Sequence, residues 1–286
     1  MEVGWLSERL AKQQDLLILP GAYDALSARL IALEGAEAVY CGGFAATASR
    51  YALPDLGLLG LSDLTAHYRS LAAACQGKAL IVDADTGHGG LLNVERTVEA
   101  LAAAGAAAFH IEDQVSPKRC GHLAGKSIED RATAFSRVRT AVVAAERHGM
   151  DVIARTDAIA VSGLEEAVER GNRFLDLGAV AIFVDAPASR DQIEAIPRRI
   201  GGPVLFNAAP TGTGPVPDHH DLTEMGYRIV IHPIEAMLAA ASAARKSVRS
   251  LLGSASEPNA LDFEEVNEVL ETRTFLQREE RYAQQD

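Results

Sequence analysis

Short apolar runs recur along this chain, and stretches with a helical spacing of apolar residues separate them. The runs occupy residues 15–21, 38–43, 78–83, 106–112, 152–157, 180–185, 203–207 and 228–233. Between them we expect a loop at residues 45–59 and helices at residues 25–33, 62–74, 93–104, 127–148, 164–177 and 191–200. About eight strands that alternate with helices predict an α/β fold, a (β/α)8 barrel of the TIM type. A doubly wound open sheet is the alternative, but no Gly-x-Gly-x-x-Gly segment follows the first run.

Further elements are expected at the two ends of the chain. They are helices at residues 1–14 and 236–252, a Gly- and Ser-containing linker at residues 253–259, and a charged amphipathic helix at residues 262–282. The pattern therefore divides the chain into a barrel domain, residues 1–252, and a linker with a C-terminal helix, residues 253–286. A barrel does not need this last helix. This C-terminal helix either packs on a neighbouring subunit or forms a solvated tail.

A polar residue stands at the end of nearly every apolar run. These residues are Asp24, just beyond the first run, and Asp83, Glu112, Arg155, Asp185, Asn207 and His232. In (β/α)8 barrels the active site lies at the carboxyl ends of the strands. The pattern therefore predicts a functional site at one mouth of the barrel.

Two of these strand ends carry carboxylates that suit a metal ion. Asp83 and Asp85 are separated by one residue, and Glu112 ends the next run. Such a cluster of hard oxygen atoms suits Mg²⁺, which keeps several waters and takes few protein ligands. Mn²⁺ is the alternative ion. The alternative to a metal site is that Asp83 and Asp85 cap a helix or stabilise a turn.

The segment that follows the fourth run places a thiol among cationic residues. Cys120 lies between Arg119 and His122, with Lys118 nearby, and these neighbours favour a reactive thiolate. The proline and glycines around it suit a loop that can move. The alternative is a surface loop in which the cysteine has no function.

Composition narrows the classes of function. The chain has 286 residues, 48% hydrophobic and 23% charged, as in ordinary globular proteins. The net charge of −12, without a basic stripe, argues against a nucleic-acid partner. Three cysteines at unrelated spacings predict neither a disulfide framework nor a zinc site. No signal peptide and no apolar run near the ~20 residues of a membrane span is found, so we expect a soluble, cytoplasmic protein.

Three motifs together resemble the isocitrate lyase/phosphoenolpyruvate mutase superfamily, and within it the 2-methylisocitrate lyase group most closely. They are Val82-Asp83-Ala84-Asp85-Thr86-Gly87, His110-Ile111-Glu112-Asp113-Gln114 and Lys118-Arg119-Cys120-Gly121-His122. The similarity extends from about residue 21 to 233 and includes Leu53-Pro54-Asp55-Leu56-Gly57. The cysteine-containing loop is the mark of the carbon–carbon lyases in this superfamily.

The resemblance implies roles for individual residues. Asp83 would bind Mg²⁺ directly, while Asp55, Asp85 and Glu112 would hold its waters. Cys120 would be the general acid, on a loop that also carries Lys118, Arg119 and His122, and Tyr40 is a candidate base. The substrate would contact Gly42, Gly43, Gly121, Arg155, Asp185, Asn207 and Arg273. The family assembles as a homotetramer that exchanges a C-terminal helix between subunits.

The implied reaction is the retro-aldol cleavage of a small carboxylate substrate, a 2-hydroxy di- or tricarboxylate, to a 2-oxo acid and a carboxylic acid. An oxaloacetate or phosphonopyruvate hydrolase, or a phosphoenolpyruvate mutase, on the same scaffold is the alternative, and a non-catalytic barrel is a further one. The chain departs from the methylisocitrate lyases at Asp185, where they carry Glu, and at Leu238, where they carry an arginine. An arginine binds a carboxylate with two hydrogen bonds, so its loss at Leu238 favours a substituted malate over a tricarboxylate as the substrate.

Overall fold

Eight parallel strands form the centre of the described structure, as the alternation of apolar runs predicts. This computed structural model describes residues 4–121, 123, 125–211, 214–253 and 262–284. The strands are β1 (Leu17–Pro20), β2 (Ala38–Cys41), β3 (Ala79–Asp83), β4 (Ala108–Glu112), β5 (Asp151–Thr156), β6 (Ala181–Val184), β7 (Val204–Asn207) and β8 (Ile229–His232). They pair in the order β1-β8-β7-β6-β5-β4-β3-β2, and a bridge between Gly21 and Tyr40 nearly closes the ring. The TIM-type barrel is confirmed.

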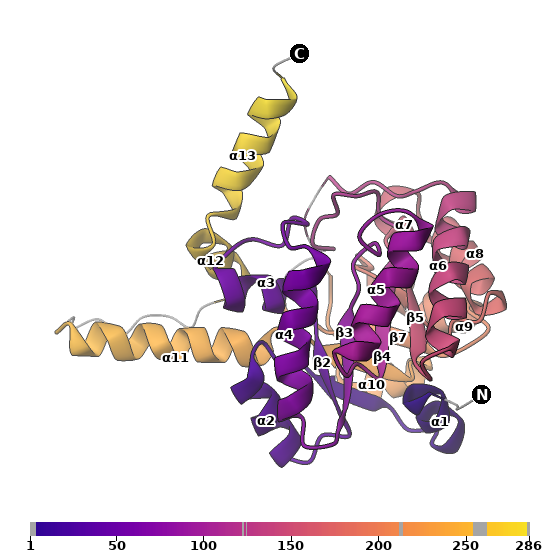
Figure 1. The fold of residues 1–286 in the computed structure, drawn as a ribbon, viewed down its shortest axis with the longest axis horizontal. Coiled ribbons are helices and arrows are strands. Elements are labelled where there is room, and N and C mark those ends of the chain that lie inside the picture. Colours follow the sequence, from indigo (N-terminus) through magenta and orange to yellow (C-terminus); the bar gives the residue numbers. More distant parts are fainter. Residues whose placement is uncertain (1–3, 122, 124, 212–213, 254–261, 285–286) are drawn as a thin grey trace.

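Helices surround this barrel (Figure 1). They are α1 (Trp5–Lys12), α2 (Ala25–Leu33), α3 (Gly43–Tyr51), α4 (Leu61–Ala74), α5 (Leu91–Ala103), α6 (Arg131–Glu146), α7 (Ala158–Val161), α8 (Leu164–Asp176), α9 (Arg190–Arg199), α10 (His219–Met225), α11 (Glu235–Leu251), α12 (Phe263–Val269) and α13 (Thr272–Ala283). None of these described helices combines the length and the apolar character that a membrane crossing requires.

The strands bury apolar residues on both faces, which explains their continuous apolar runs. Inward-facing residues such as Tyr40, Ile81 and Phe183 fill the barrel, and α1 closes its lower end with Leu6. Outward-facing residues such as Phe109 pack against the surrounding helices in a second, larger layer. The site at the opposite end of the barrel therefore rests on a rigid support.

The structure corrects two expectations about local elements. Residues 43–51 form α3, where a loop was expected, because three alanines between Gly43 and Tyr51 favour a helix and Ala46 is buried in the core. The expected single helix at residues 262–282 is two helices, α12 and α13, since Glu271 adopts a left-handed backbone with φ 54°. The expected domain boundary, between residues 252 and 253, lies just after the end of α11, and residues 254–259 of the expected linker lie outside the described part of the chain.

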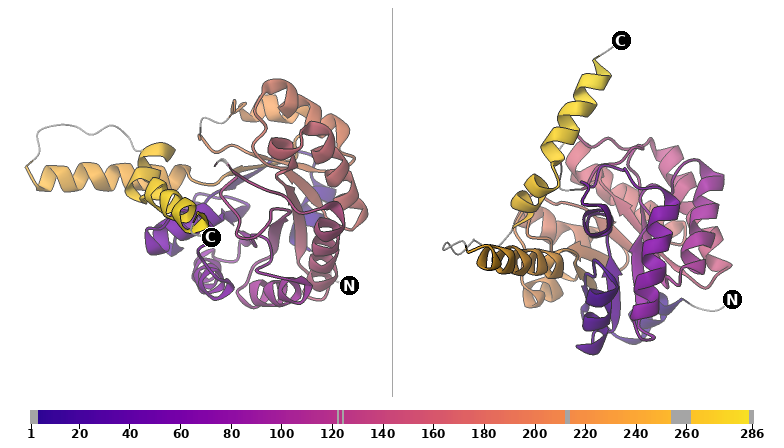
Figure 2. Two further views of the ribbon diagram at one scale, coloured as in Figure 1. Left: turned by 90° about the horizontal axis from the view of Figure 1, so that it is seen from above. Right: turned by 60° about the vertical axis from the view of Figure 1, so that its left-hand side comes forward.

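The helix that follows β8 does not cover its own barrel. In Figures 1 and 2, α11 extends away from the strands, and it buries only Met237 and Leu238. The outer side of the neighbouring β1 is accordingly open, with Ile18 39% exposed. Large apolar side chains of α2 are exposed as well, at Leu26 and Leu30. An apolar surface is thus left next to the place where the eighth helix of a barrel would pack.

Candidate active site

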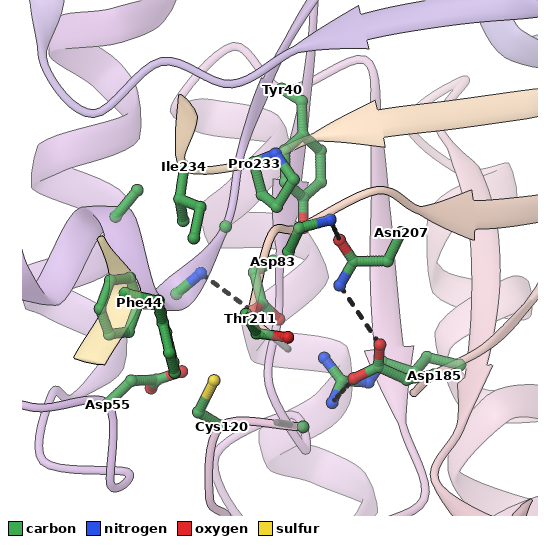
Figure 3. A pocket seen from close by; sticks show the side chains of 17 residues that line it. Tyr40, Phe44, Asp55, Asp83, Cys120, Asp185, Asn207, Thr211, Pro233 and Ile234 are labelled. Carbon is green, nitrogen blue, oxygen red and sulfur yellow. Dashed lines mark hydrogen bonds and ion pairs between the residues drawn. The ribbon is translucent and has the colours of Figure 1, made fainter. Parts of the chain in front are cut away.

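A cavity opens at the carboxyl-terminal mouth of the barrel, where the strand-end residues meet (Figure 3). Polar side chains line one part of it and apolar side chains another. The lining residues are Tyr40, Gly42, Gly43, Phe44, Ala45, Asp55, Asp83, Cys120, Gly121, Arg155, Asp185, Asn207, Ala209, Thr211, Pro233, Ile234 and Phe263. Segments from residue 40 to residue 263 therefore converge on one small space.

Asp83 is held firmly at the end of β3. Its Oδ2 atom accepts a hydrogen bond from the Gly43 N–H at 3.0 Å, and its Oδ1 atom accepts one from the Asp85 N–H at 2.8 Å. A Cβ atom on Gly43 would lie 2.9 Å from Asp83 Oδ2. Glycine at this position thus allows the first turn of α3 to approach the carboxylate.

Lys118 joins two further acids of this cluster. Its Nζ atom lies 2.7 Å from Asp55 Oδ1 and 2.8 Å from Asp85 Oδ1, and none of the three side chains is more than 9% exposed. Burial opposes the charge of the ammonium group, but the surrounding carboxylates raise the pKa of Lys118 well above its usual value. A permanent positive charge therefore holds Asp55, which follows α3, beside Asp85, which follows β3.

Burial and crowding separate the pKa values of these acids. Burial alone would raise the pKa of Asp83, but the positive groups around it lower that pKa to about 2. Burial and the nearby carboxylates raise the pKa of Asp85 to about 7, although Lys118 opposes this. Burial also raises the pKa of Glu112 well above its usual value. Like charges this close cannot all ionise unless further positive charge is present.

The donor atoms fit a hard divalent cation. Both carboxylate oxygens of Glu112 are buried without a hydrogen-bond partner in the described part of the chain, although Arg155 Nε lies 3.2 Å from one of them. Buried polar atoms normally have partners. No three His, Cys, Asp or Glu side chains among the described residues converge as direct ligands. This arrangement suits an ion that keeps most of its waters, as Mg²⁺ does, and that reaches the outer carboxylates through them.

The thiol of Cys120 enters the cavity from the segment after β4. The Cys120 N–H donates to the Asp55 carbonyl oxygen at 3.0 Å, and the side chain of Gln114 bonds both the N–H and the carbonyl of Arg119. A Cβ atom on Gly121 would lie 1.7 Å from Asp185 Oδ2, so only glycine fits against that acid. Cys120 itself is 9% exposed, and in Figure 3 it lies beside Asp55 at the edge of the cavity.

Arg155 lines the cavity beside Asp185. Its guanidinium lies 2.7 Å from Asp185 Oδ2 and 2.9 Å from Asp157 Oδ2, and the Asn207 amide donates to Asp185 Oδ1 at 3.3 Å. Burial would lower the pKa of Arg155, but these carboxylates raise it well above its usual value. The guanidinium therefore stays charged and can bind a substrate carboxylate.

The sequence model of the phosphoenolpyruvate phosphomutase family matches residues 6–252. The chain belongs to this family.

Relatives within the family catalyse several reactions. The chain is 39% identical over 259 residues to the 2-methylisocitrate lyase of Aeropyrum pernix, covering 91% of this chain and 83% of the relative. The crystal structure of 2,3-dimethylmalate lyase, a PEP mutase/isocitrate lyase superfamily member, matches with a TM-score of 0.83 at 34% identity, covering 97% of this chain and 94% of that chain. Oxaloacetate acetylhydrolase with the inhibitor 3,3-difluorooxalacetate matches with a TM-score of 0.83 at 33% identity, covering 97% and 96%. The superfamily resemblance is confirmed, and this chain is an enzyme of the superfamily.

The structure brings most of the predicted site residues to the mouth of this phosphoenolpyruvate phosphomutase-family barrel, but places some elsewhere. Arg119 points away from the cavity and lies 2.5 Å from Glu279 of α13. Arg273 is exposed on α13 and does not line the described cavity. His122 lies outside the described residues. Of the other strand-end residues, Asp24 caps α2, and His232 pairs on the outside of the barrel with His219 and Glu235.

Sequence reasoning missed His110, which lies behind the cavity in this family member. Its Nε2 atom is 2.7 Å from the Tyr40 hydroxyl, and its Nδ1 atom is 3.4 Å from Asp83 Oδ1. Burial lowers the pKa of His110 and raises that of Tyr40, so both side chains are neutral near pH 7. The signal was present, since His110 begins the motif that contains Glu112 and lies two positions before it on the inward side of β4.

Proposed function

We propose that this enzyme is a Mg²⁺-dependent carbon–carbon lyase that cleaves a 2-hydroxy dicarboxylate to a 2-oxo acid and a carboxylic acid. The observation that carries the proposal is the shared cavity, in which the Cys120 thiol faces the same space as Asp83 and Arg155. An acid, a metal-binding carboxylate and a carboxylate-binding cation are the three groups that this chemistry requires. The 2-methylisocitrate and 2,3-dimethylmalate lyases among the relatives support it.

The substrate would be held between the acid cluster and Arg155. Asp83 would bind the ion directly, with Asp55, Asp85 and Glu112 holding its waters, and the bound ion would lower the pKa of the substrate hydroxyl. Arg155 would bind a carboxylate. The N-terminus of α3, at Gly42 and Gly43, borders the same cavity, and the N-terminus of a helix favours a negative group.

Proton transfer begins the proposed reaction and ends it. The 2.7 Å contact between Tyr40 and His110 supports a relay in which Tyr40 accepts the hydroxyl proton while it passes its own to His110 Nε2. The alkoxide becomes a carbonyl as the adjacent carbon–carbon bond breaks. The electron pair of that bond stays on the second fragment, which leaves as a carboxylate enolate. The Cys120 S–H then gives its proton to the enolate carbon.

An apolar wall of the cavity supports an alkyl-substituted malate as the substrate. Phe44, Ile234 and Phe263 line it, and the rings of Phe44 and Phe263 lie 5.0 Å apart. Leu238, at the position where the resemblance places an arginine in methylisocitrate lyases, is buried in this apolar cluster. A third carboxylate would lose its hydration here without an ionic partner, whereas alkyl groups gain from burial.

The direct test is a screen of substituted malates, 2-methylisocitrate and oxaloacetate, in which 2-oxo acid release is followed with and without Mg²⁺. We expect turnover of an alkyl-substituted malate that stops when the metal is chelated. The likeness to oxaloacetate acetylhydrolase supports a second candidate, hydrolysis of oxaloacetate on the same scaffold. Oxalate release from oxaloacetate, without cleavage of any hydroxy acid, would favour that candidate and overturn the lyase proposal.

We further infer that the protein forms homo-oligomers, with the homotetramer as the expected state. The exposed apolar side chains of Ile18, Leu26 and Leu30 support this, since α11 leaves them uncovered in its own chain. Helix α11 of a second copy would bury them and replace the missing eighth helix of the barrel.

A further inference from the structure

A buried lysine outside the cavity holds the segment that carries Cys120. Lys126 Nζ lies 2.9 Å from Asp157 Oδ1 and also donates a hydrogen bond to the main-chain carbonyl oxygen of Gly121. The Lys126 side chain is only 5% exposed, and that of Asp157 is fully buried. A buried ammonium group costs much free energy unless its partners are this close. None of the steps proposed above uses Lys126.

The partner of Lys126 is shared with the substrate-binding arginine. Arg155 Nε donates to Asp157 Oδ2 at 2.9 Å, and Arg155 Nη2 donates to Asp157 Oδ1 at 3.1 Å. The Asp157 N–H in turn donates to Asp113 Oδ1 at 3.0 Å, which fixes this acid at the end of β5. A single rigid carboxylate therefore orients Arg155 and anchors Lys126.

The main chain at Gly121 lies against the same group of residues. A Cβ atom there would be 1.7 Å from Asp185 Oδ2 and 2.5 Å from Arg155 Nη2. Cys120, the preceding residue, is held from the other side by the Asp55 carbonyl oxygen. Hydrogen bonds with Asp55 and Lys126 thus hold Cys120 and Gly121 from two sides.

We propose that Lys126 is a positioning residue that ties the Gly121 carbonyl to Asp157 and thereby sets the place of the Cys120 thiol in the cavity. The thiol's placement can be measured without any substrate. The consequence for catalysis rests on the proposed function, in which Cys120 protonates the enolate.

The first experiment measures the alkylation rate of each cysteine by iodoacetamide, with peptide mass spectrometry, in the substrate-free protein. In Lys126→Met we expect Cys120 to react roughly tenfold faster or more, because its segment has lost an anchoring contact. Cys41 and Cys75 are fully buried and should stay slow, which shows that the barrel is folded. Lys126→Arg keeps the charge and the donors, and should react at nearly the parental rate.

A matched control removes a buried cation from the other end of the barrel. Arg9, with a side chain 5% exposed and paired with Glu37, offers this site. Arg9→Met should leave the Cys120 rate unchanged. An unchanged Cys120 rate in Lys126→Met, or an equal acceleration in Arg9→Met, would overturn the proposal. So would acceleration of all three cysteines in both Lys126→Met and Lys126→Arg, because Lys126 would then serve general stability.

Turnover gives a second readout. On a hydroxy acid that the parent cleaves, Lys126→Met should lower kcat by about 10²-fold, the loss typical of a reacting group displaced by ~1 Å, with KM little changed. Lys126→Arg should recover part of kcat. Faster alkylation of Cys120 with an unchanged kcat would overturn the catalytic consequence. Failure of the parent to cleave any hydroxy acid would contradict the proposed function instead, and the labelling result would still decide the placement.

Discussion

Replacing Cys120 by serine changes the acidity of one group and little of the shape of the site. The loop is held by contacts that do not involve the sulfur, namely the Cys120 N–H to the Asp55 carbonyl and the Lys126 hydrogen bond to Gly121. In the proposed reaction, substrate binding rests on other residues, Asp83 and Arg155. The serine variant should therefore bind Mg²⁺ and substrate as the parent does.

The expected loss lies in the proton transfer. A serine hydroxyl is far less acidic than a thiol and gives its proton poorly to an enolate carbon. A positioned general acid contributes about 10²–10⁴-fold, or ~2.7–5.4 kcal/mol of transition-state stabilisation. Cys120 is only 9% exposed, so bulk water has little access to replace it. We expect kcat to fall by about 10²-fold or more and KM to stay within about threefold.

The assay follows 2-oxo acid release by an NADH-coupled reduction, on the substrate that the parent cleaves, and calorimetry measures Mg²⁺ and substrate affinity. Cys75→Ser is the matched control, because Cys75 is a buried thiol at the end of α4 that does not line the cavity. It should keep nearly parental turnover. If Cys120→Ser turned over within a few-fold of the parent, Cys120 would not be the acid and the lyase proposal would lose its main support.

Three further predictions follow from the proposed metal site, the C-terminal segment and the ion pairs of Glu166. Asp83→Ala should abolish Mg²⁺ binding in calorimetry with an unchanged circular dichroism spectrum, and an unchanged affinity would contradict its role as direct ligand. Deletion of residues 253–286 should reduce the oligomer mass in light scattering, because the segment after α11 exposes Val269 and would pack on the second copy together with α11. A parental mass after deletion, or a monomeric parent, would rule this out. Hydrogen bonds from Arg131 and Arg170 lower the pKa of Glu166 to about 2. The stability that this pairing contributes is therefore present above the unfolded pKa near 4.5 and is lost as pH falls toward 2. Glu166→Gln should accordingly cost ~1 kcal/mol at pH 7 and almost nothing near pH 2 in urea titrations, and an equal cost at both pH values would refute the assignment.

The pattern of the chain determined the barrel and the mouth at which its site lies. Strands buried on both faces must be apolar throughout, so their runs and their count are legible in the sequence. Parallel strands of one barrel all end at the same mouth, so the polar residues that follow them must meet there. Asp83, Arg155, Asp185 and Asn207 were therefore predictable as neighbours from their positions alone, and the cavity contains all four.

Local elements were predicted less well where composition and context disagree. The segment from residue 45 to residue 59 holds a proline and a glycine, Pro54 and Gly57, which are typical of a loop, yet α3 occupies its first part because Ala45 and Ala46 pack into the interior. The C-terminal amphipathic pattern gave no sign of a break, because residue Glu271 is a helix-favouring type in a left-handed conformation.

Only the tertiary structure decided which groups touch across the site. Lys118 bridges Asp55 and Asp85, two residues from separate loops, while its sequence neighbour Arg119 turns outward to Glu279. Neighbours in a loop can face opposite ways, and no periodicity records which of them points inward. The apolar wall at Phe44 and the anchoring contact of Lys126 likewise depend on how segments far apart in the chain pack, and that packing is set when the barrel closes.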